Sequence, residues 1–163
     1  MLIFGVDGGG EQKKNSLKSD RGTGWCLIQV DAVDDMVLPE LMEHGQIAGG
    51  PDNFLQWVHE ALEWTRAEVM VVENFRPMSA RVDAGPLEIV GMVKAIGLLT
   101  NKKVVVREPS QRTLVSHDDL KANAMWPGGA GHADTAQAIR HVISWLISTG
   151  HTGTINLFAP DPG

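Results

Sequence analysis

Short apolar runs, each closed by glycines or polar residues, dominate the first part of the chain. Residues 2–7 (LIFGVD), 24–30 (GWCLIQV) and 41–48 (LMEHGQIA) are strand-like in length and composition. The acidic segment between the second and third runs has the composition of a hairpin connection. The pattern therefore predicts three antiparallel strands at the start of the chain.

The periodicity changes at residue 51, after which helical and strand-like segments alternate. Apolar residues recur every three or four positions in the helical segments, and β-type runs lie between them. In chain order we expect a helix from residue 51, a strand at 68–75, a helix at 86–101, a strand at 103–109 and helices at 116–124 and 132–149. The order βββαβαβαα predicts an α/β fold with a mixed five-stranded sheet and helices on both faces.

Two of the predicted helix starts carry a capping-box pattern. In such a box, two polar side chains three residues apart each accept a hydrogen bond from the other residue's backbone N–H. Asn53 with Gln56 predicts one box, and Ser116 with Asp119 predicts the other.

The length and composition suit one ordinary core. With 163 residues, 43% of them hydrophobic, we expect a single domain over residues 1–150 and a C-terminal tail over 151–163. Residues 11–21 (EQKKNSLKSDR) carry four basic and two acidic side chains, a local charge of +2, and predict a flexible basic insertion.

Several features favour a cytoplasmic protein. No apolar stretch approaches the roughly 18 residues of a membrane span, and the start of the chain lacks the pattern of a secretory leader. Cys26 is a single cysteine and has no partner for an internal disulfide, so we expect it to be a core residue in a reducing compartment.

The formal net charge is −6, from 14 Lys and Arg against 20 Asp and Glu. A protein that coats nucleic acid nonspecifically needs a basic footprint, so this charge argues against that class. An enzyme that meets nucleic acid through a local basic patch is compatible with it.

Three acidic residues stand at positions where functional groups collect. Asp7 ends the first predicted strand, Glu73 ends the fourth, and Asp134 opens the last long helix. If the first and fourth strands are neighbours, Asp7 and Glu73 lie side by side at one edge of the sheet, and Asp134 completes a three-carboxylate cluster. Such a cluster favours a bound cation, and Mg²⁺ with its oxygen ligands suits phosphoryl chemistry.

Each acid also has a simpler interpretation, and these stay open at this point. Asp7 precedes three glycines and could support a tight turn. Glu73 could be a solvated charge at the end of a strand, and Asp134 could favour the dipole of its helix. His132, just before the helix, is a candidate proton carrier or ligand, or else a cap; His141 we interpret as structural.

The stretches GVDGGG, TGWCLI, MVVENF and GHADTAQAIRHVISWL together resemble the RuvC-like Holliday junction resolvases of the RNase H-like superfamily. The short phage-type members, with a helix of the form HxxDAxRHA, are the most similar in pattern. The resemblance spans about residues 2–148.

This resemblance implies a homodimer that nicks branched DNA with a metal-activated water, using Mg²⁺ or, in its place, Mn²⁺. A phage-encoded protein of this kind would act in the cytoplasm of its bacterial host. By position, Asp7, Glu73 and Asp134 match the family's metal-binding acids, and Phe75 falls where such enzymes insert an apolar side chain between opened base steps. Candidate DNA contacts are Lys13, Lys14, Arg76, Arg81, Arg112 and Lys121.

Two departures from the family pattern stand out. Its acid or histidine three residues before the aspartate is replaced here by Gly131, with His132 only two residues before Asp134. Whether His132 supplies a fourth ligand therefore stays open. The insertion at 11–21 is the second departure, either a disordered excursion or a basic arm that meets phosphates.

Other functions compete with the nuclease hypothesis. GVDGGG also resembles the phosphate loop of the actin, Hsp70 and sugar-kinase superfamily, although those proteins pair two such domains and favour threonine where this chain has Glu11. An RNase H-type nuclease acting on RNA/DNA hybrids and a catalytically inactive junction-binding protein are further alternatives.

Overall fold

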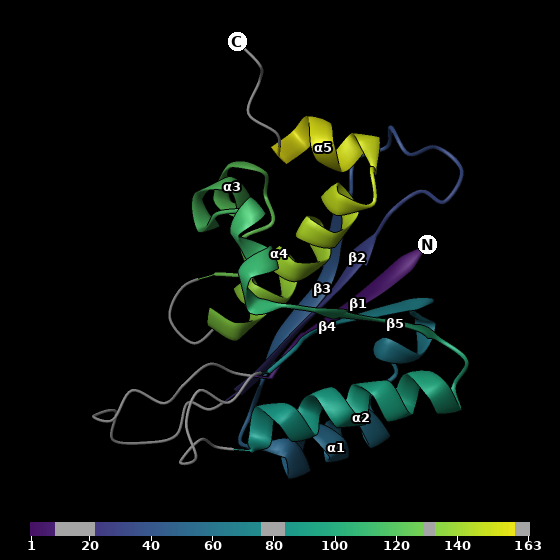
Figure 1. The fold of residues 1–163 in the computed structure, drawn as a ribbon, viewed down its shortest axis with the longest axis vertical. Helices are drawn as coiled ribbons and strands as arrows, with labels where there is room; N and C mark the ends of the chain where they lie inside the picture. The colour runs from purple at the N-terminus through teal and green to yellow at the C-terminus, as the bar shows by residue number, and fades with distance from the viewer. Residues whose placement is uncertain (9–21, 76–83, 129–132, 159–163) are drawn as a thin grey trace.

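The computed structural model describes residues 1–8, 22–75, 84–128 and 133–158 (Figure 1). The strands are β1 (Leu2–Asp7), β2 (Gly22–Gln29), β3 (Glu40–Ala48), β4 (Val69–Glu73) and β5 (Lys103–Arg107). The α-helices are α1 (Pro51–Glu60), α2 (Gly85–Leu99), α3 (His117–Ala122), α4 (Ala133–Ser148) and α5 (Thr152–Phe158). Short 3-10 helices, η1 (Trp64–Arg66) and η2 (Pro109–Leu114), precede β4 and α3.

The strands of the described residues form one mixed sheet in the order β3-β2-β1-β4-β5. The first three strands pair antiparallel, whereas β4 and β5 are parallel to β1. This arrangement confirms the predicted mixed five-stranded sheet. It also confirms that the first and fourth strands are neighbours, which is what brings their acidic ends together.

Helices cover both faces of the sheet, as the sequence predicts (Figure 1). On one face, α1 and α2 bury a cluster that includes Phe4 and Leu27. On the other face, α4 packs with α3 and α5 over a cluster that includes Ile3 and Ile28. Because adjacent residues of a strand face opposite sides, both faces of β1 are buried, which explains its continuous apolar run.

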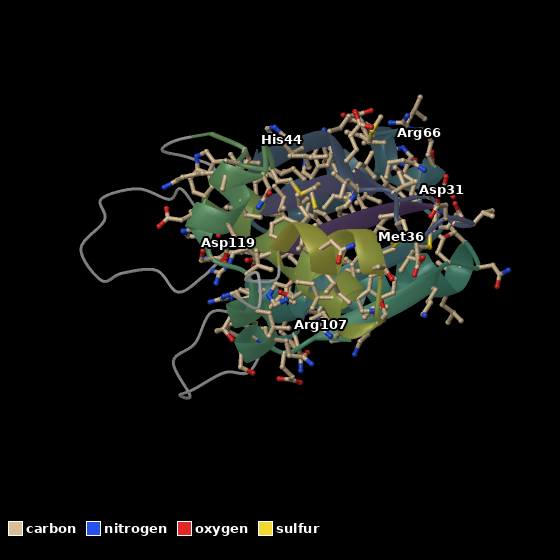
Figure 2. The ribbon with its side chains drawn as sticks, turned by 90° about the horizontal axis from the view of Figure 1, so that it is seen from above. Asp31, Met36, His44, Arg66, Arg107 and Asp119 are labelled. Atoms are coloured by element: carbon tan, nitrogen blue, oxygen red, sulfur yellow. The ribbon has the colours of Figure 1, made fainter. Side chains whose placement is uncertain are left out.

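The two capping predictions have opposite outcomes. Ser116 and Asp119 form the predicted box at the start of α3, with Asp119 Oδ2 accepting from the Ser116 backbone at 2.7 Å (Figure 2). The Asn53 box is wrong, because α1 begins at Pro51 with Gly50 as its N-cap and the Asn53 side chain instead donates to the Ala48 carbonyl at 2.9 Å.

Part of the predicted tail forms a helix. Residues Thr152–Phe158 form α5, and Phe158 is buried in the cluster under α4. The Gly153 N–H donates to the Asp35 carbonyl at 2.5 Å, which fixes α5 against the β2–β3 connection. The expectation of a tail is therefore wrong for residues 152–158. The apolar contacts of Leu157 and Phe158 and the backbone bond to Asp35 hold a helix that is too short to show a clear periodicity. None of the helices in the described ranges combines the length and apolar character needed to cross a membrane.

Candidate active site

A row of residues in register crosses the sheet at the end of β1. Asp7 lies opposite Gly24 of β2, and Gly24 lies opposite Gln46 of β3. On the other side, Val6 of β1 pairs with Val72 of β4. Since these strands are parallel, the next residues along them, Asp7 and Glu73, are neighbours. Glu73 in turn pairs with Arg107 of β5. Residues in register share a face, and for this row it is the face covered by α4.

Gly24 determines where α4 meets the sheet. A Cβ on Gly24 would lie 2.0 Å from the carbonyl carbon of Asp134 and 2.1 Å from the backbone N of Thr135. The first turn of α4 therefore rests directly on the backbone of β2, next to Asp7. Gly5, two residues before Asp7 on the same face, provides similar room for Val142 and for the carbonyl of Ala138.

Asp134 is held by the neighbouring strand. Gln46 donates its side-chain Nε2–H to Asp134 Oδ2 at 2.6 Å. Thr135, the next residue of α4, is buried and donates its hydroxyl to the Gly45 carbonyl at 2.6 Å. Asp134 thus enters the same end of the sheet as Asp7 and Glu73, as predicted.

Glu73 is engaged by side chains from two other elements. Its Oε2 accepts a hydrogen bond from Arg112 of η2 at 2.6 Å and contacts Nε2 of His141, which lies on α4. The Glu73 side chain is 15% exposed and that of His141 is fully buried. Arg112, expected as a DNA contact, is therefore an ion-pair partner of Glu73 in this structure.

Two opposing effects act on the pKa of Glu73. Burial tends to raise it, whereas the hydrogen bonds and positive charges supplied by His141 and Arg112 lower it. The net result holds the pKa of Glu73 below its ordinary value of 4.5. Glu73 is consequently a carboxylate at neutral pH despite its burial.

Asp7 is 6% exposed at the end of β1, on the face of the sheet that α4 covers. Gly8 follows it, and a Cβ there would lie 3.2 Å from Cα of Pro86 at the start of α2. The glycine at this position serves close packing of the strand end against a helix. Gly9 and Gly10 of the same run lie outside the described residues.

The donor set of this site fits Mg²⁺, which prefers carboxylate oxygens. Within the part of the chain that the structure describes, however, no three His, Cys, Asp or Glu side chains lie close enough together to hold a metal ion. Asp7, Glu73 and Asp134 share one face and one end of the sheet, but Glu73 is turned to Arg112 and His141. The three predicted carboxylates therefore lie at one end of the sheet, but among the described residues they do not converge closely enough to bind one metal ion together.

The remaining predicted site residues fall into two groups. Lys121 lies on α3, where its ammonium pairs with Asp118 at 3.3 Å and sits 5.0 Å from the centre of the Trp126 ring. Phe75 is half-buried just past β4. The others lie outside the described residues: Lys13, Lys14, Arg76, Arg81 and His132.

The sequence interpretation missed three contributors. His141 was assigned a structural role, although it is seven residues from Asp134, two helical turns along the same side of α4. No sequence pattern points to a contact of Gln46 with Asp134, because its position opposite Gly24 depends on the register of β2 and β3. Arg107, labelled in Figure 2, is 7% exposed and donates to Ser148 Oγ at 3.3 Å, and its Nε has no partner among the described residues.

Similar folds occur in solved structures of Holliday junction resolvases. Thermus thermophilus RuvC in complex with Holliday junction substrate has a TM-score of 0.60 and 16% identity, covering 92% of this chain and 97% of that chain. A second Thermus thermophilus RuvC structure has a TM-score of 0.57 and 14% identity, covering 93% and 98%. Fowlpox virus resolvase in complex with its substrate Holliday junction DNA has a TM-score of 0.62 and 16% identity, covering 92% and 99%.

No protein-family model matches the chain, and no curated protein matches it by sequence. At 14–16% identity the structural similarity shows the fold. The chain has the RuvC-like arrangement of the RNase H-like fold, as the sequence resemblance predicted.

Proposed function

We propose that this protein is a divalent-metal-dependent endodeoxyribonuclease that cuts Holliday junctions or related branched DNA. The observation that carries the proposal is the position of Asp7, Glu73 and Asp134 at one end and on one face of the sheet. Similar folds belong to RuvC and to a poxvirus resolvase, both found in complex with Holliday junction DNA.

Asp7, Glu73 and Asp134 would hold Mg²⁺, with Mn²⁺ as a substitute. When bound, the cation would supply an activated water and would stabilise charge on the phosphate. The chain's own residues supply position: β1 and β4 deliver two carboxylates side by side, and Gly24 lets α4 deliver the third. In the absence of the cation, Arg112 forms an ion pair with Glu73, and His141 contacts the same carboxylate oxygen.

The same site could belong to a binding protein that does not cut. The observation that favours this second function is the engagement of Glu73 by Arg112 and His141, together with the absence of a closed ligand group in the described residues. Junction binding would then depend on the shape and charge of the surface, with no requirement for a cation. A single cleavage experiment distinguishes the two functions.

DNA contacts in this proposal come from basic side chains, with Phe75 as the apolar side chain that meets an opened base step. Lys13, Lys14, Arg76, Arg81 and Lys121 are the basic candidates, and Arg112 joins them once Glu73 binds a cation. A negatively charged protein needs such a local patch, because phosphate contacts dominate the affinity for DNA.

A homodimer suits a junction with two equivalent strands, since each protomer would nick one of them. The outer side of α2 supports this part of the proposal. Leu87, Leu98 and Leu99 on this helix are 48%, 82% and 84% exposed. Leu98 and Leu99 are adjacent at the end of α2, whereas Leu87 lies eleven residues earlier, so Leu98 and Leu99 are the candidate contact with a second chain.

The test is cleavage of labelled four-way junction, flap, duplex, single-stranded DNA and RNA/DNA hybrid, with and without Mg²⁺. We expect paired nicks in the junction that require Mg²⁺ and are lost in Asp7→Asn, Glu73→Gln and Asp134→Asn. Junction binding without nicks, unchanged in Asp7→Asn, would support the binding protein. Cleavage of the hybrid alone would support an RNase H-type enzyme, and tight ATP binding without nucleic acid would support the kinase-like alternative.

A further inference from the structure

Gln46 uses both ends of its side-chain amide on the first turn of α4. Its Nε2–H donates to Asp134 Oδ2 at 2.6 Å. Its Oε1 accepts from the backbone N of Thr135 at 3.3 Å and from the Thr135 hydroxyl at 3.2 Å. One side chain of an edge strand therefore contacts a carboxylate, a backbone donor and a hydroxyl of the helix that carries the third acid.

The glycines of β2 give Gln46 this reach. Gln46 lies opposite Gly24, and the first turn of α4 occupies the space above Gly24. Two residues earlier on the same face, a Cβ on Gly22 would lie 2.1 Å from Nε2 of Gln46. The Gln46 amide can therefore lie across β2, because Gly22 and Gly24 have no side chains there.

The two ends of the amide perform different tasks. The Oε1 contacts belong to helix docking, which Thr135 shares through its bond to the Gly45 carbonyl. The Nε2 contact is with the Asp134 carboxylate and turns its Oδ2 toward β3. A hydrogen bond of this kind orients a metal-binding carboxylate, and loss of such a bond typically weakens metal binding 10–100-fold.

We propose that Gln46 is a positioning residue for the metal site, which holds Asp134 Oδ2 so that the other carboxylate oxygen is presented toward Asp7 and Glu73. This inference rests on the proposed function, because it assigns Asp134 a metal. It goes beyond that function by giving the edge strand β3 a direct part in metal affinity.

The test measures Mn²⁺ binding to the purified protein without DNA, by electron paramagnetic resonance of free Mn²⁺, alongside thermal unfolding. Gln46→Met keeps the length of the side chain and removes both hydrogen-bonding groups. Thr135→Val is the matched control, because it removes the hydroxyl bonds to the Gly45 carbonyl and to Gln46 Oε1 and leaves Gln46 Nε2 on Asp134. Gly22→Ala is a second variant, in which residue 46 is unchanged and the added methyl displaces its amide.

We expect Gln46→Met and Gly22→Ala to bind Mn²⁺ about 10–100-fold more weakly than wild type while still unfolding cooperatively. Thr135→Val should lose thermal stability and keep wild-type Mn²⁺ affinity. If the Thr135 and Gln46 variants lose stability alike and both keep wild-type affinity, Gln46 is only a docking residue and the inference is overturned.

Asp134→Asn separates this failure from failure of the proposed function. Wild-type Mn²⁺ binding that Asp134→Asn abolishes and Gln46→Met leaves unchanged overturns the role of Gln46 alone. If wild type itself binds no Mn²⁺, or if Asp134→Asn binds it as wild type does, the metal site is wrong and the inference falls with it.

Discussion

Gly24 lies opposite Asp7 in the sheet, and the space left by its missing side chain is filled by the backbone of Asp134. Two acids that are far apart in the sequence are therefore brought together by a glycine that touches both of their elements. The site depends on this contact as much as on the carboxylates themselves.

We expect Gly24→Ala to displace the first turn of α4, because its Cβ would lie 2.0 Å from the Asp134 carbonyl carbon. Overpacking of this kind typically costs about 1–3 kcal/mol of stability, and cleavage should fall at least tenfold as Asp134 moves. Chemical denaturation and the junction assay measure the two effects. Gly50→Ala is the control, since its Cβ meets open space, and should retain full activity. Equal behaviour of the two variants would contradict the prediction.

Arg112→Ala should destabilise the metal-free protein near neutral pH by about 1–3 kcal/mol, because Glu73 loses a charged hydrogen-bond donor. The lowered pKa of Glu73 sets the pH dependence. Its contribution to stability is fully present above 4.5, the ordinary value, and is lost as the pH falls through the lower pKa of the folded state. The stability difference between wild type and variant should therefore shrink on acidification.

Denaturant titrations from neutral pH into the acid range measure this difference, and carbon NMR of the glutamate carboxylates should show the pKa of Glu73 rising in the variant. Lys121→Ala removes a positive charge from neighbouring α3 without touching Glu73, and should leave both quantities unchanged. A stability difference that stays constant with pH would mean that Arg112 acts through packing.

Leu98→Glu should convert a dimer into a monomer if α2 forms the contact, since it places a charge among exposed apolar side chains. Analytical ultracentrifugation over a range of concentrations measures the change. Val33→Glu alters a residue that is 97% exposed on the β2–β3 connection and should leave the mass unchanged. A monomeric wild-type protein, or a Leu98→Glu dimer, would remove α2 from the proposal.

Junction binding should weaken steeply with salt, because a protein of net charge −6 must rely on a limited set of phosphate contacts. Binding titrations at several salt concentrations give the number of contacts from the slope. Lys13→Ala with Lys14→Ala should reduce the slope by about two if both lysines meet phosphates. Affinity that does not change with salt would contradict an electrostatic interface.

The sequence predicted the sheet and the positions of Asp7 and Glu73 well, because a buried strand that ends in an acid is visible in a short window. Pairing of the first and fourth strands was a conditional expectation, and the structure bears it out. Asp134 followed from its place at the start of a strongly periodic helix. These predictions need only the local pattern and the usual connections between elements.

The hydrogen bonds that hold the acidic side chains could not be predicted from local sequence patterns. Gln46 meets Asp134 across 88 residues of sequence, and Arg112 meets Glu73 across 39. Both contacts depend on register and on the placement of η2, which no local pattern encodes. His141 lies two helical turns after Asp134, a spacing that the sequence itself shows, but the interpretation of His141 as structural leaves out its contact with Glu73.

The hydrogen bonds that the chain's own donors make to Glu73 and Asp134 affect how the protein folds when no cation is bound. Carboxylates gathered at one end of a sheet repel one another, and many metal sites acquire their structure only when the ion arrives. Here Arg112, His141 and Gln46 already provide that compensation. We therefore expect folding to be independent of metal supply, so that chelation would remove the proposed nuclease activity reversibly and leave the fold intact.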